Sequence, residues 1–204
     1  MHLHRSRLVN ALTDVDHPTQ LLADWLTIRE NFGTDISGRK FVYLGDGNNM
    51  SHAWLIMGAI MGAHVVAATP SGKWAPDPVV VAVAKNIAAN SGGKVEVTND
   101  PEAAAKDASV LYTDVWMSMG DSESDRKEKV QALSPFAVTE HLMKMASKDS
   151  LFMHCLPAHR GEEVEANVID GPRSVIWREA YHRRTTIQSI LYHLVRGDLK
   201  GYTH

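Results

Sequence analysis

The sequence is poor in the features that mark several broad classes of protein. It has one cysteine, Cys155, in 204 residues, which excludes an internal disulfide framework and a zinc site built from several cysteines. Its longest nearly apolar stretch, residues 53–63, is far shorter than the ~20 residues that a membrane-spanning helix needs. Its first residues lack the apolar segment of a secretory signal. We therefore expect a protein of a reducing compartment, the cytoplasm, with no membrane partner.

The chain also lacks an excess of basic residues. It has 21 lysines and arginines against 24 acidic residues, for a net charge of -3, and this argues against nucleic acid as a partner because phosphate binding needs a basic face. Hydrophobic residues make up 44% and charged residues 22%, as in globular domains. We find no repeats and no low-complexity linker.

Short apolar runs alternate with helical patterns from residue 40 onward. Strands are predicted over residues 40–44, 64–68, 94–98, 109–113, 151–154 and 174–177. Helices are predicted over residues 17–31, 49–61, 78–90, 101–106, 126–133, 139–145 and 185–196, with Asp16 as a candidate cap of the first. Strands that are apolar on both faces indicate a parallel sheet covered on both sides by helices. The sequence thus predicts a doubly wound, mostly parallel α/β fold.

Polar and reactive side chains follow several of the predicted strands. Residues 45–49 follow the first, residues 114–120 the fourth and residues 155–160 the fifth. Arg178, Glu179 and, a little later, Arg183 follow the sixth. Because ligands of an open parallel sheet bind outside the carboxyl ends of its strands, these segments predict a small-molecule site at one edge.

The glycine-rich segment 45–49 has two other interpretations. It is compatible with a tight strand–helix turn, where glycine and asparagine permit positive φ. It also resembles a dinucleotide fingerprint, but Met50 stands where the third glycine should be. Thr69 and Pro70 follow the second strand in place of an acidic residue. We therefore disfavour an NAD-binding domain.

Two further patterns have ordinary explanations. His154, Cys155 and His159 would suggest a metal, but no other His/Cys pair stands at ligand spacing nearby, so we predict none. The mixed charge run over residues 121–129 is typical of a solvated loop.

Four motifs occur in a fixed order, namely His17-Pro18-Thr19-Gln20, Gly45-Asp46-Gly47-Asn48-Asn49, Asp114-Val115-Trp116-Met117-Ser118-Met119-Gly120 and His154-Cys155-Leu156-Pro157. Together they resemble the ornithine carbamoyltransferase family, over about residues 12–196. The Asp-x-Trp-x-Ser-Met-Gly and His-Cys-Leu-Pro motifs are specific. The first separates ornithine enzymes from relatives that use aspartate, putrescine or acetylornithine. The resemblance implies transfer of a carbamoyl group from carbamoyl phosphate to the δ-amine of ornithine, which gives citrulline and phosphate.

The resemblance also implies roles for individual residues that bind ornithine. Asn49 matches the asparagine that holds its amino-acid end, and Asp114 matches the aspartate that binds its amine. Ser118 and Met119 match the loop that closes over ornithine.

Carbamoyl phosphate has its own set of matches. His17 and Gln20 match the motif that contacts the carbamoyl group, and Arg183 aligns with an arginine that contacts carbamoyl phosphate. Cys155 and Leu156 match residues that line the place where the δ-amine meets the carbamoyl carbon.

The chemistry agrees with these assignments. The δ-amine must be neutral to attack, yet its reference pKa resembles that of lysine, ~10.4. Asp114 and Cys155 are therefore candidates for orienting the amine and taking up its proton. His17 and Arg183 are candidates for stabilising the negative charge on the carbamoyl oxygen in the transition state. Neither a metal nor an organic cofactor is required.

The sequence departs from the family in two places. Family members begin with a domain of roughly a hundred or more residues that carries a Ser-x-Arg-Thr phosphate loop and a further arginine, and neither occurs here. We therefore take residues 1–16 as the remnant or linker of that domain. Residues 17–204 are then the ornithine-binding domain, with inter-domain helices near 17–31 and 185–196. Tyr181 and His182 precede Arg183, where the family usually has Glu-Asn.

Partners follow from the same comparison. The family's trimer contacts lie mostly in the first domain, so we expect a homo-oligomer if that domain is present. Without it, the helices near residues 17–31 and 185–196 should leave an exposed apolar surface that favours self-association.

Two hypotheses share every motif. The chain is either part of a carbamoyltransferase or a non-catalytic module that binds ornithine or a similar diamino acid. The absence of the phosphate loop favours inactivity of the isolated chain.

Overall fold

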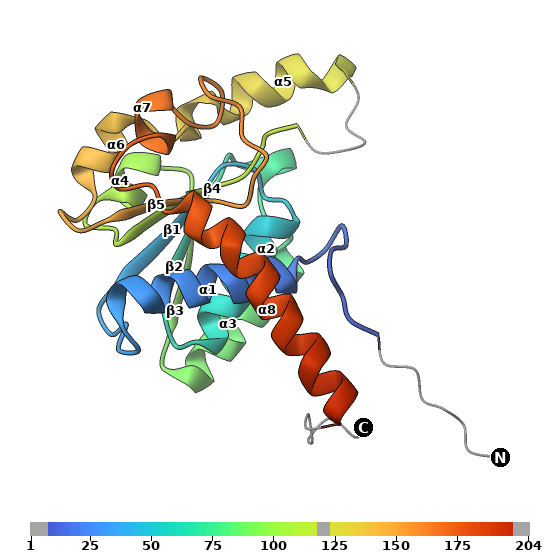
Figure 1. Cartoon of the computed structure of the whole chain (residues 1–204). Helices are drawn as coiled ribbons and strands as arrows, with labels where there is room; N and C mark the ends of the chain where they lie inside the picture. The colour runs from blue at the N-terminus through green and yellow to red at the C-terminus, as the bar shows by residue number, and fades with distance from the viewer. Residues whose placement is uncertain (1–7, 118–122, 198–204) are drawn as a thin grey trace.

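A computed structural model describes residues 8–117 and 123–197 of the chain. In this part of the chain the sheet has five parallel strands in the order β3-β2-β1-β4-β5. Their bounds are β1 Lys40–Leu44, β2 His64–Ala68, β3 Lys94–Thr98, β4 Val110–Thr113 and β5 Leu151–His154. The predicted doubly wound α/β fold is confirmed (Figure 1).

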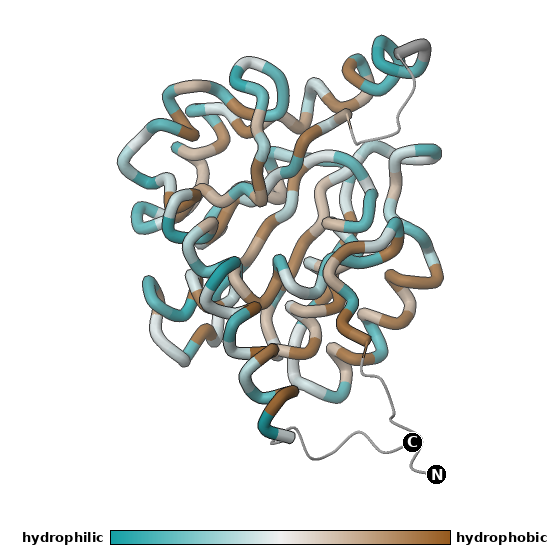
Figure 2. The backbone as a smooth tube through the Cα atoms, turned by 45° about the vertical axis from the view of Figure 1, so that its right-hand side comes forward, coloured by the Kyte–Doolittle hydropathy of each residue, from teal (hydrophilic) through white to brown (hydrophobic). Residues whose placement is uncertain are grey.

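Helices cover both faces of this sheet. One hydrophobic cluster joins it to α1 (Pro18–Phe32), α2 (Asn49–Ile60) and α3 (Pro78–Ser91). The opposite cluster joins it to α4 (Pro101–Ala105), η2 (Ser134–Phe136), α6 (Glu140–Met145) and α7 (Ala166–Ile169). The remaining elements are η1 (Gly72–Trp74), α5 (Glu123–Leu133) and the long helix α8 (Ile176–Arg196). Figure 2 shows hydrophilic and hydrophobic residues alternating along the outer helices, as expected for helices with one buried face.

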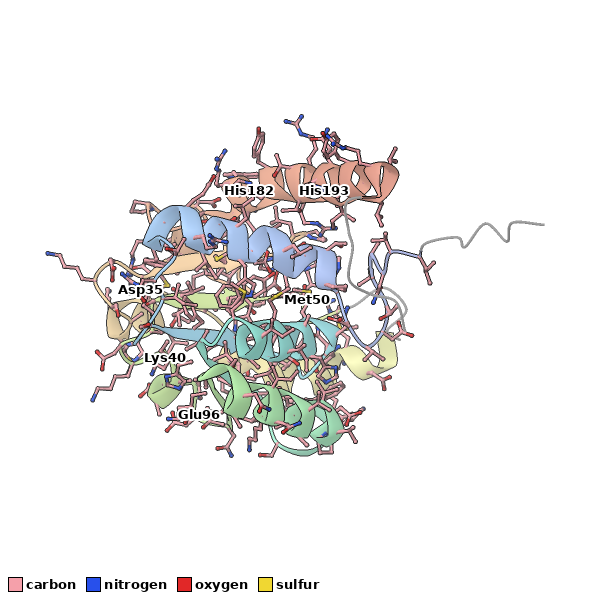
Figure 3. All side chains as sticks on the ribbon, turned by 90° about the horizontal axis from the view of Figure 1, so that it is seen from below. Asp35, Lys40, Met50, Glu96, His182 and His193 are labelled. Carbon is pink, nitrogen blue, oxygen red and sulfur yellow. The ribbon has the colours of Figure 1, made fainter. Side chains whose placement is uncertain are left out.

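Aromatic side chains fill the core between α1, α2 and the sheet. The ring of Trp54 lies 4.6 Å from that of Tyr112 and 6.2 Å from that of Trp25, measured between centroids. Trp54 and Tyr112 are fully buried, and Trp25 is nearly so. This cluster fixes α1 over the sheet. Helix α8 lies on the outside of α1, with His182 near their junction (Figure 3).

Three of the sequence predictions are wrong in the described chain. Residues 174–177 do not form a sixth strand, because Ser174 makes only an isolated bridge to Phe152 and α8 begins at Ile176. A short apolar run fits a buried helix start as well as a strand. Asp16 does not cap α1, whose N-cap residue is His17. The run 121–129 is not a solvated loop over its described part, since α5 begins at Glu123.

Helix α5 carries a buried ion pair where the sequence suggested only solvated charges. Lys129 is 4% exposed, and its Nζ lies 2.8 Å from Oδ2 of Asp46. The side chain of Lys129 also contacts Trp74, whose ring centroid lies 5.3 Å from its Nζ. These contacts hold α5 against the segment that follows β1.

Apolar side chains are exposed on α8, which contains one of the two helices at which an apolar surface was expected. Trp177, Leu191, Tyr192 and Val195 are exposed, the last at 87%. Self-association through this surface stays a prediction. In the described ranges, no helix combines the length and the apolar character needed to cross a bilayer.

Candidate functional site

The site lies where the order of the strands changes direction. The chain runs outward from β1 through β2 to β3 and then returns to add β4 and β5 on the other side of β1. The segments after β1 and β4 therefore leave two neighbouring strands in opposite directions. This switch point is the place where open α/β sheets bind ligands.

Asn48 organises the segment after β1. Its side-chain oxygen caps α2 by accepting hydrogen bonds from the backbone N–H groups of Met50 (2.9 Å) and Ser51 (3.2 Å). It also accepts one from the hydroxyl of Tyr43 (3.1 Å). With the oxygen so engaged, the amide nitrogen of Asn48 points away and donates to Oδ2 of Asp114 (3.0 Å). The cap of the helix thus orients a group in the site.

The two glycines before Asn48 are required by space and conformation. Gly45 has φ of 136°, a value that other residues rarely adopt. A Cβ on Gly47 would lie 2.2 Å from the carbonyl carbon of Ala75. The structure therefore supports the tight-turn interpretation of this segment.

Asp114 and Cys155 meet across the ends of β4 and β5. The thiol of Cys155 donates to Oδ1 of Asp114 at 2.9 Å, and the backbone N–H of Val115 donates to the same oxygen at 2.7 Å. Burial raises the pKa of the Cys155 thiol well above its usual range, and the negative charge of Asp114 raises it further. Cys155 is therefore a neutral donor at physiological pH. We name Asn48, Asp114 and Cys155 the strand-end cluster.

The backbone after Cys155 is held in an unusual conformation. Leu156 has φ of 58°, which is uncommon for a residue other than glycine and frequent at functional sites. Its N–H donates to Nδ1 of His154 (2.8 Å). The buried His154 ring in turn places Nε2 3.4 Å from the buried carboxylate of Glu163. Nothing in the sequence indicated a role for Glu163.

His17, Gln20 and Arg183 also come together, on helices rather than strands. Nη1 of Arg183 donates to the amide oxygen of Gln20 and lies 3.3 Å from Nε2 of His17. Burial lowers the pKa of His17, and the charge of Arg183 lowers it further. The ring is therefore neutral near pH 7, with Nε2 facing a donor. We name these three residues the helix cluster.

A buried pair of acids lies between the two clusters. The amide nitrogen of Gln20 donates to Asp24 (2.8 Å) and to Oε1 of Glu179 (3.1 Å). Oε2 of Glu179 accepts from the backbone N–H of His154 (3.1 Å), which begins the segment that carries Cys155. Sequence reasoning placed Glu179 after a strand without a role and missed Asp24. The one available signal in the sequence was that Asp24, an acidic residue, falls on the inner face of α1.

Asn49 is not joined to these clusters by any side-chain contact described here. The amide of Asn49 donates to the backbone oxygen of Thr13 at 3.1 Å. Ser118 and Met119 lie outside the described residues.

Two buried N–H groups at this edge, Trp116 Nε1 and Arg183 Nε, have no partner in the described chain. The same is true of Trp25 Nε1 and Trp54 Nε1 in the aromatic core, so a buried N–H without a described partner does not by itself mark a ligand site here. Two cavities, of about 260 and 190 Å³, are lined by residues that belong to neither cluster. We therefore define the site by the hydrogen bonds among its residues and not by a cavity.

The sequence analysis weighed His154, Cys155 and His159 as metal ligands and predicted no metal there. Within the described ranges, the one group with ligand atoms close enough to hold an ion is His159, Glu162 and Glu163. Neither His154 nor Cys155 belongs to it, and Glu162 is paired with Arg126. None of the contacts described above joins His159, Glu162 or Glu163 directly to the strand-end cluster.

Comparison with known proteins gives a consistent result. Residues 37–194 match the family described as aspartate/ornithine carbamoyltransferase, Asp/Orn binding domain. The chain is 49% identical to the ornithine carbamoyltransferase of Pyrococcus abyssi over 195 residues, which are 96% of this chain and 61% of that protein.

Solved structures agree. The ornithine carbamoyltransferase from Pyrococcus furiosus is 50% identical with a TM-score of 0.83, over 89% of this chain and 57% of that one. The anabolic enzyme from Campylobacter jejuni is 34% identical with a TM-score of 0.86, over 95% and 63% of the two chains. The chain spans about 61% of the length of the curated relative named above.

Proposed function

The chain belongs to the aspartate/ornithine carbamoyltransferase family, and we propose that it supplies the ornithine half of a site that transfers a carbamoyl group from carbamoyl phosphate to L-ornithine. One observation carries the choice of ornithine. The carboxylate of Asp114 lies at the switch point of the sheet, 8% exposed and oriented by Cys155 and Asn48. A fixed carboxylate at such a place is complementary to an ammonium group.

The proposed reaction makes one bond and breaks one. The δ-nitrogen of ornithine attacks the carbamoyl carbon, a C–N bond forms, and the C–O bond to phosphate breaks. The neutral amine loses one N–H proton, which ends on the departing phosphate, so the products are citrulline and hydrogen phosphate. No metal or organic cofactor enters this balance.

Asp114 and Cys155 divide the work on the amine in this proposal. Because the Cys155 thiol is neutral and donates to Asp114, its sulfur lone pairs are free to accept an N–H of the incoming amine. Asp114 binds the amino group of ornithine as a charge partner. Held in this way, the δ-nitrogen presents its lone pair to the carbamoyl carbon, which is a positioning effect.

The carbamoyl-phosphate half rests on the helix cluster. Arg183 is the cation there, and its Nε is a buried donor without a described partner. His17 is neutral, so its share in stabilising the carbamoyl oxygen comes from hydrogen bonding and not from charge. A dianionic phosphate normally needs several charge-assisted donors, and Arg183 is the only charged donor among the three residues of the helix cluster. We therefore propose that the 204-residue chain by itself binds ornithine and has little transfer activity.

The second candidate is an ornithine-binding module without catalysis. It is favoured by the way Arg183 is engaged with Gln20 and His17. The two candidates differ in activity and share the ornithine site.

Calorimetry with L-ornithine, L-aspartate and putrescine tests the proposal. We expect ornithine to bind and the other two compounds to bind at least about tenfold more weakly than ornithine. Aspartate would place a second carboxylate near Asp114, and putrescine lacks the amino-acid end. Citrulline formation from carbamoyl phosphate and ornithine is measured on the same sample. Preference for aspartate would overturn the assignment of the substrate. Turnover at the rate of a whole enzyme would overturn the statement about the isolated chain.

A further inference from the structure

Glu179 links the helix cluster to the backbone of the segment that carries Cys155, through its two oxygens. Oε1 accepts from the amide of Gln20 in the helix cluster, at 3.1 Å. Oε2 accepts from the backbone N–H of His154, one residue before Cys155, at 3.1 Å. The hydroxyl of Tyr112 lies 3.5 Å from Oε1. Glu179 is completely buried, so no water competes for these donors.

A second buried carboxyl faces it. Asp24 is also completely buried, and its Oδ1 accepts from the same amide nitrogen of Gln20 at 2.8 Å. Its Oδ2 has no donor among the described residues, and the carboxyl lies within hydrogen-bonding reach of Glu179. Two adjacent buried carboxylates repel each other, and a proton between them removes the repulsion and satisfies Oδ2.

We propose that Asp24 and Glu179 share one proton and act together as a positioning pair that holds the helix cluster and the strand-end cluster in register. The pair fixes the Gln20 amide with its nitrogen inward, so that its oxygen meets Arg183. Through Glu179 it fixes the backbone at His154 and thereby the start of the Cys155 segment. Neither residue is proposed to touch substrate.

The surroundings of the pair favour the shared proton. Tyr112 from β4, His154 at the end of β5 and Cys155 after it face the pair from the sheet side, and the charge of Arg183 on α8 acts on Asp24. Burial raises the pKa of both carboxyls, that of Asp24 to about 7, against the opposing effect of hydrogen bonds and of Arg183.

The pair makes stability depend on pH in a stated direction. In the unfolded chain Asp24 loses its proton near pH 3.8, whereas in the folded chain it keeps the proton up to about pH 7. Folding therefore takes up a proton between these values. The contribution of Asp24 to stability is therefore complete below pH 3.8, falls as the pH rises and levels off above about 7. The contribution of Glu179, whose pKa burial also raises, falls in the same direction as the pH rises.

Asp24→Asn tests the shared proton. Its oxygen still accepts from Gln20, and its N–H stands where the proton of Asp24 would be. We expect a melting temperature close to that of the parent at about pH 5 and about 3 °C or more above it at about pH 8. Glu30→Gln is the control, since Glu30 also joins α1 to α8, through Arg178 and His182, but contacts neither cluster. It should show no such gain at the higher pH.

Glu179→Gln tests the positioning role, which rests on the proposed function. One amide oxygen cannot replace two carboxylate oxygens, so either Gln20 or His154 loses its acceptor. We expect ornithine to bind at least about fivefold more weakly than to the parent, with the affinity of Asp24→Asn and of Glu30→Gln within about twofold.

Three results would overturn the inference. A variant Asp24→Asn that melts below the parent at both pH values would mean that no proton is shared. An equal gain at the higher pH in Glu30→Gln would mean that the effect is not specific to the pair. Unchanged ornithine affinity in Glu179→Gln would remove the positioning role. If the parent does not bind ornithine, the proposed function fails and the pH comparison still decides the shared proton.

Discussion

The two clusters at the edge of the sheet are supported in different ways. Asp114 and Cys155 of the strand-end cluster directly follow β4 and β5, whose backbones are fixed by neighbouring strands. The helix cluster stands on α1 and α8, which pack outside the sheet. Each member of the strand-end cluster is held by at least one other member at 2.9–3.0 Å. This difference teaches that one half of the site is a product of the sheet itself, whereas the other depends on how two helices dock.

The largest effect should come from a residue on which both clusters depend. Trp54→Ala should lower the free energy of unfolding by about 3–5 kcal/mol, because Trp54 is fully buried between Trp25 of α1 and Tyr112 of β4. Urea denaturation measures it. Trp177→Ala, at a side chain 72% exposed, is the matched control and should change stability by no more than about 0.5 kcal/mol. Equal losses in both variants would contradict the aromatic support described here.

Asp114→Asn tests the strand-end cluster directly. The loss of the carboxylate charge should weaken ornithine binding by about 1–3 kcal/mol, since a neutral amide would replace the charged acceptor of the Cys155 thiol and of the substrate amine. Calorimetry against the parent gives the value. Unchanged affinity would remove Asp114 from the site.

A comparison of Asn48, a member of that cluster, with its neighbour Asn49 separates folding from binding. Asn48→Ala should cost about 1 kcal/mol of folding stability, because Asn48 caps α2 and contacts Asp114. Asn49→Ala removes only a bond to the backbone of Thr13, so it should leave stability nearly unchanged while lowering ornithine affinity if Asn49 holds the amino-acid end. Thermal melts and calorimetry of both variants separate the roles. The reverse pattern would mean that Asn48 is not the residue that caps α2.

Arg183→Ala should leave the strand-end cluster intact. Arg183 contacts Gln20 and His17 and neither Asp114 nor Cys155 in any bond described above. We therefore expect ornithine affinity within about twofold of the parent. The free energy of unfolding should fall by about 1–3 kcal/mol, because the buried amide oxygen of Gln20 loses its donor. A larger loss of ornithine affinity, measured by the same calorimetry, would show that the two clusters are not separable.

The smallest change in stability is expected at the far end of α8. Leu191→Glu combined with Val195→Glu alters two exposed positions, so the free energy of unfolding should change by less than about 0.5 kcal/mol. Sedimentation of the parent should show association that rises with concentration, and the variant should stay monomeric. A parent that sediments as a monomer at both low and high concentration would contradict the self-association hypothesis.

Much of this architecture was readable from the sequence because local patterns encode it. The apolar runs at residues 40–44, 64–68, 94–98 and 151–154 predicted strands with the bounds that the structure has. The order of the four motifs was enough for the family, since each motif is a short local segment. Residues 174–177 were predicted wrongly because a short apolar run does not distinguish a strand from a buried helix start. The cap at Asp16 and the loop at residues 121–129 were wrong because local composition does not fix where a helix begins.

Only the tertiary structure decided the contacts between distant parts of the chain. The donation of Asn48 to Asp114 joins residues 66 positions apart, and that of Gln20 to Glu179 joins residues 159 positions apart. No periodicity records such pairs, because they depend on the order of strands in the sheet and on the docking of α8 against α1. The burial of Asp24, Glu179 and Lys129 has the same origin. The sequence by itself determined the strands, the helices and the motifs, and the packing of those elements decided which side chains meet, since contacts across a sheet are set by its topology and not by neighbours along the chain.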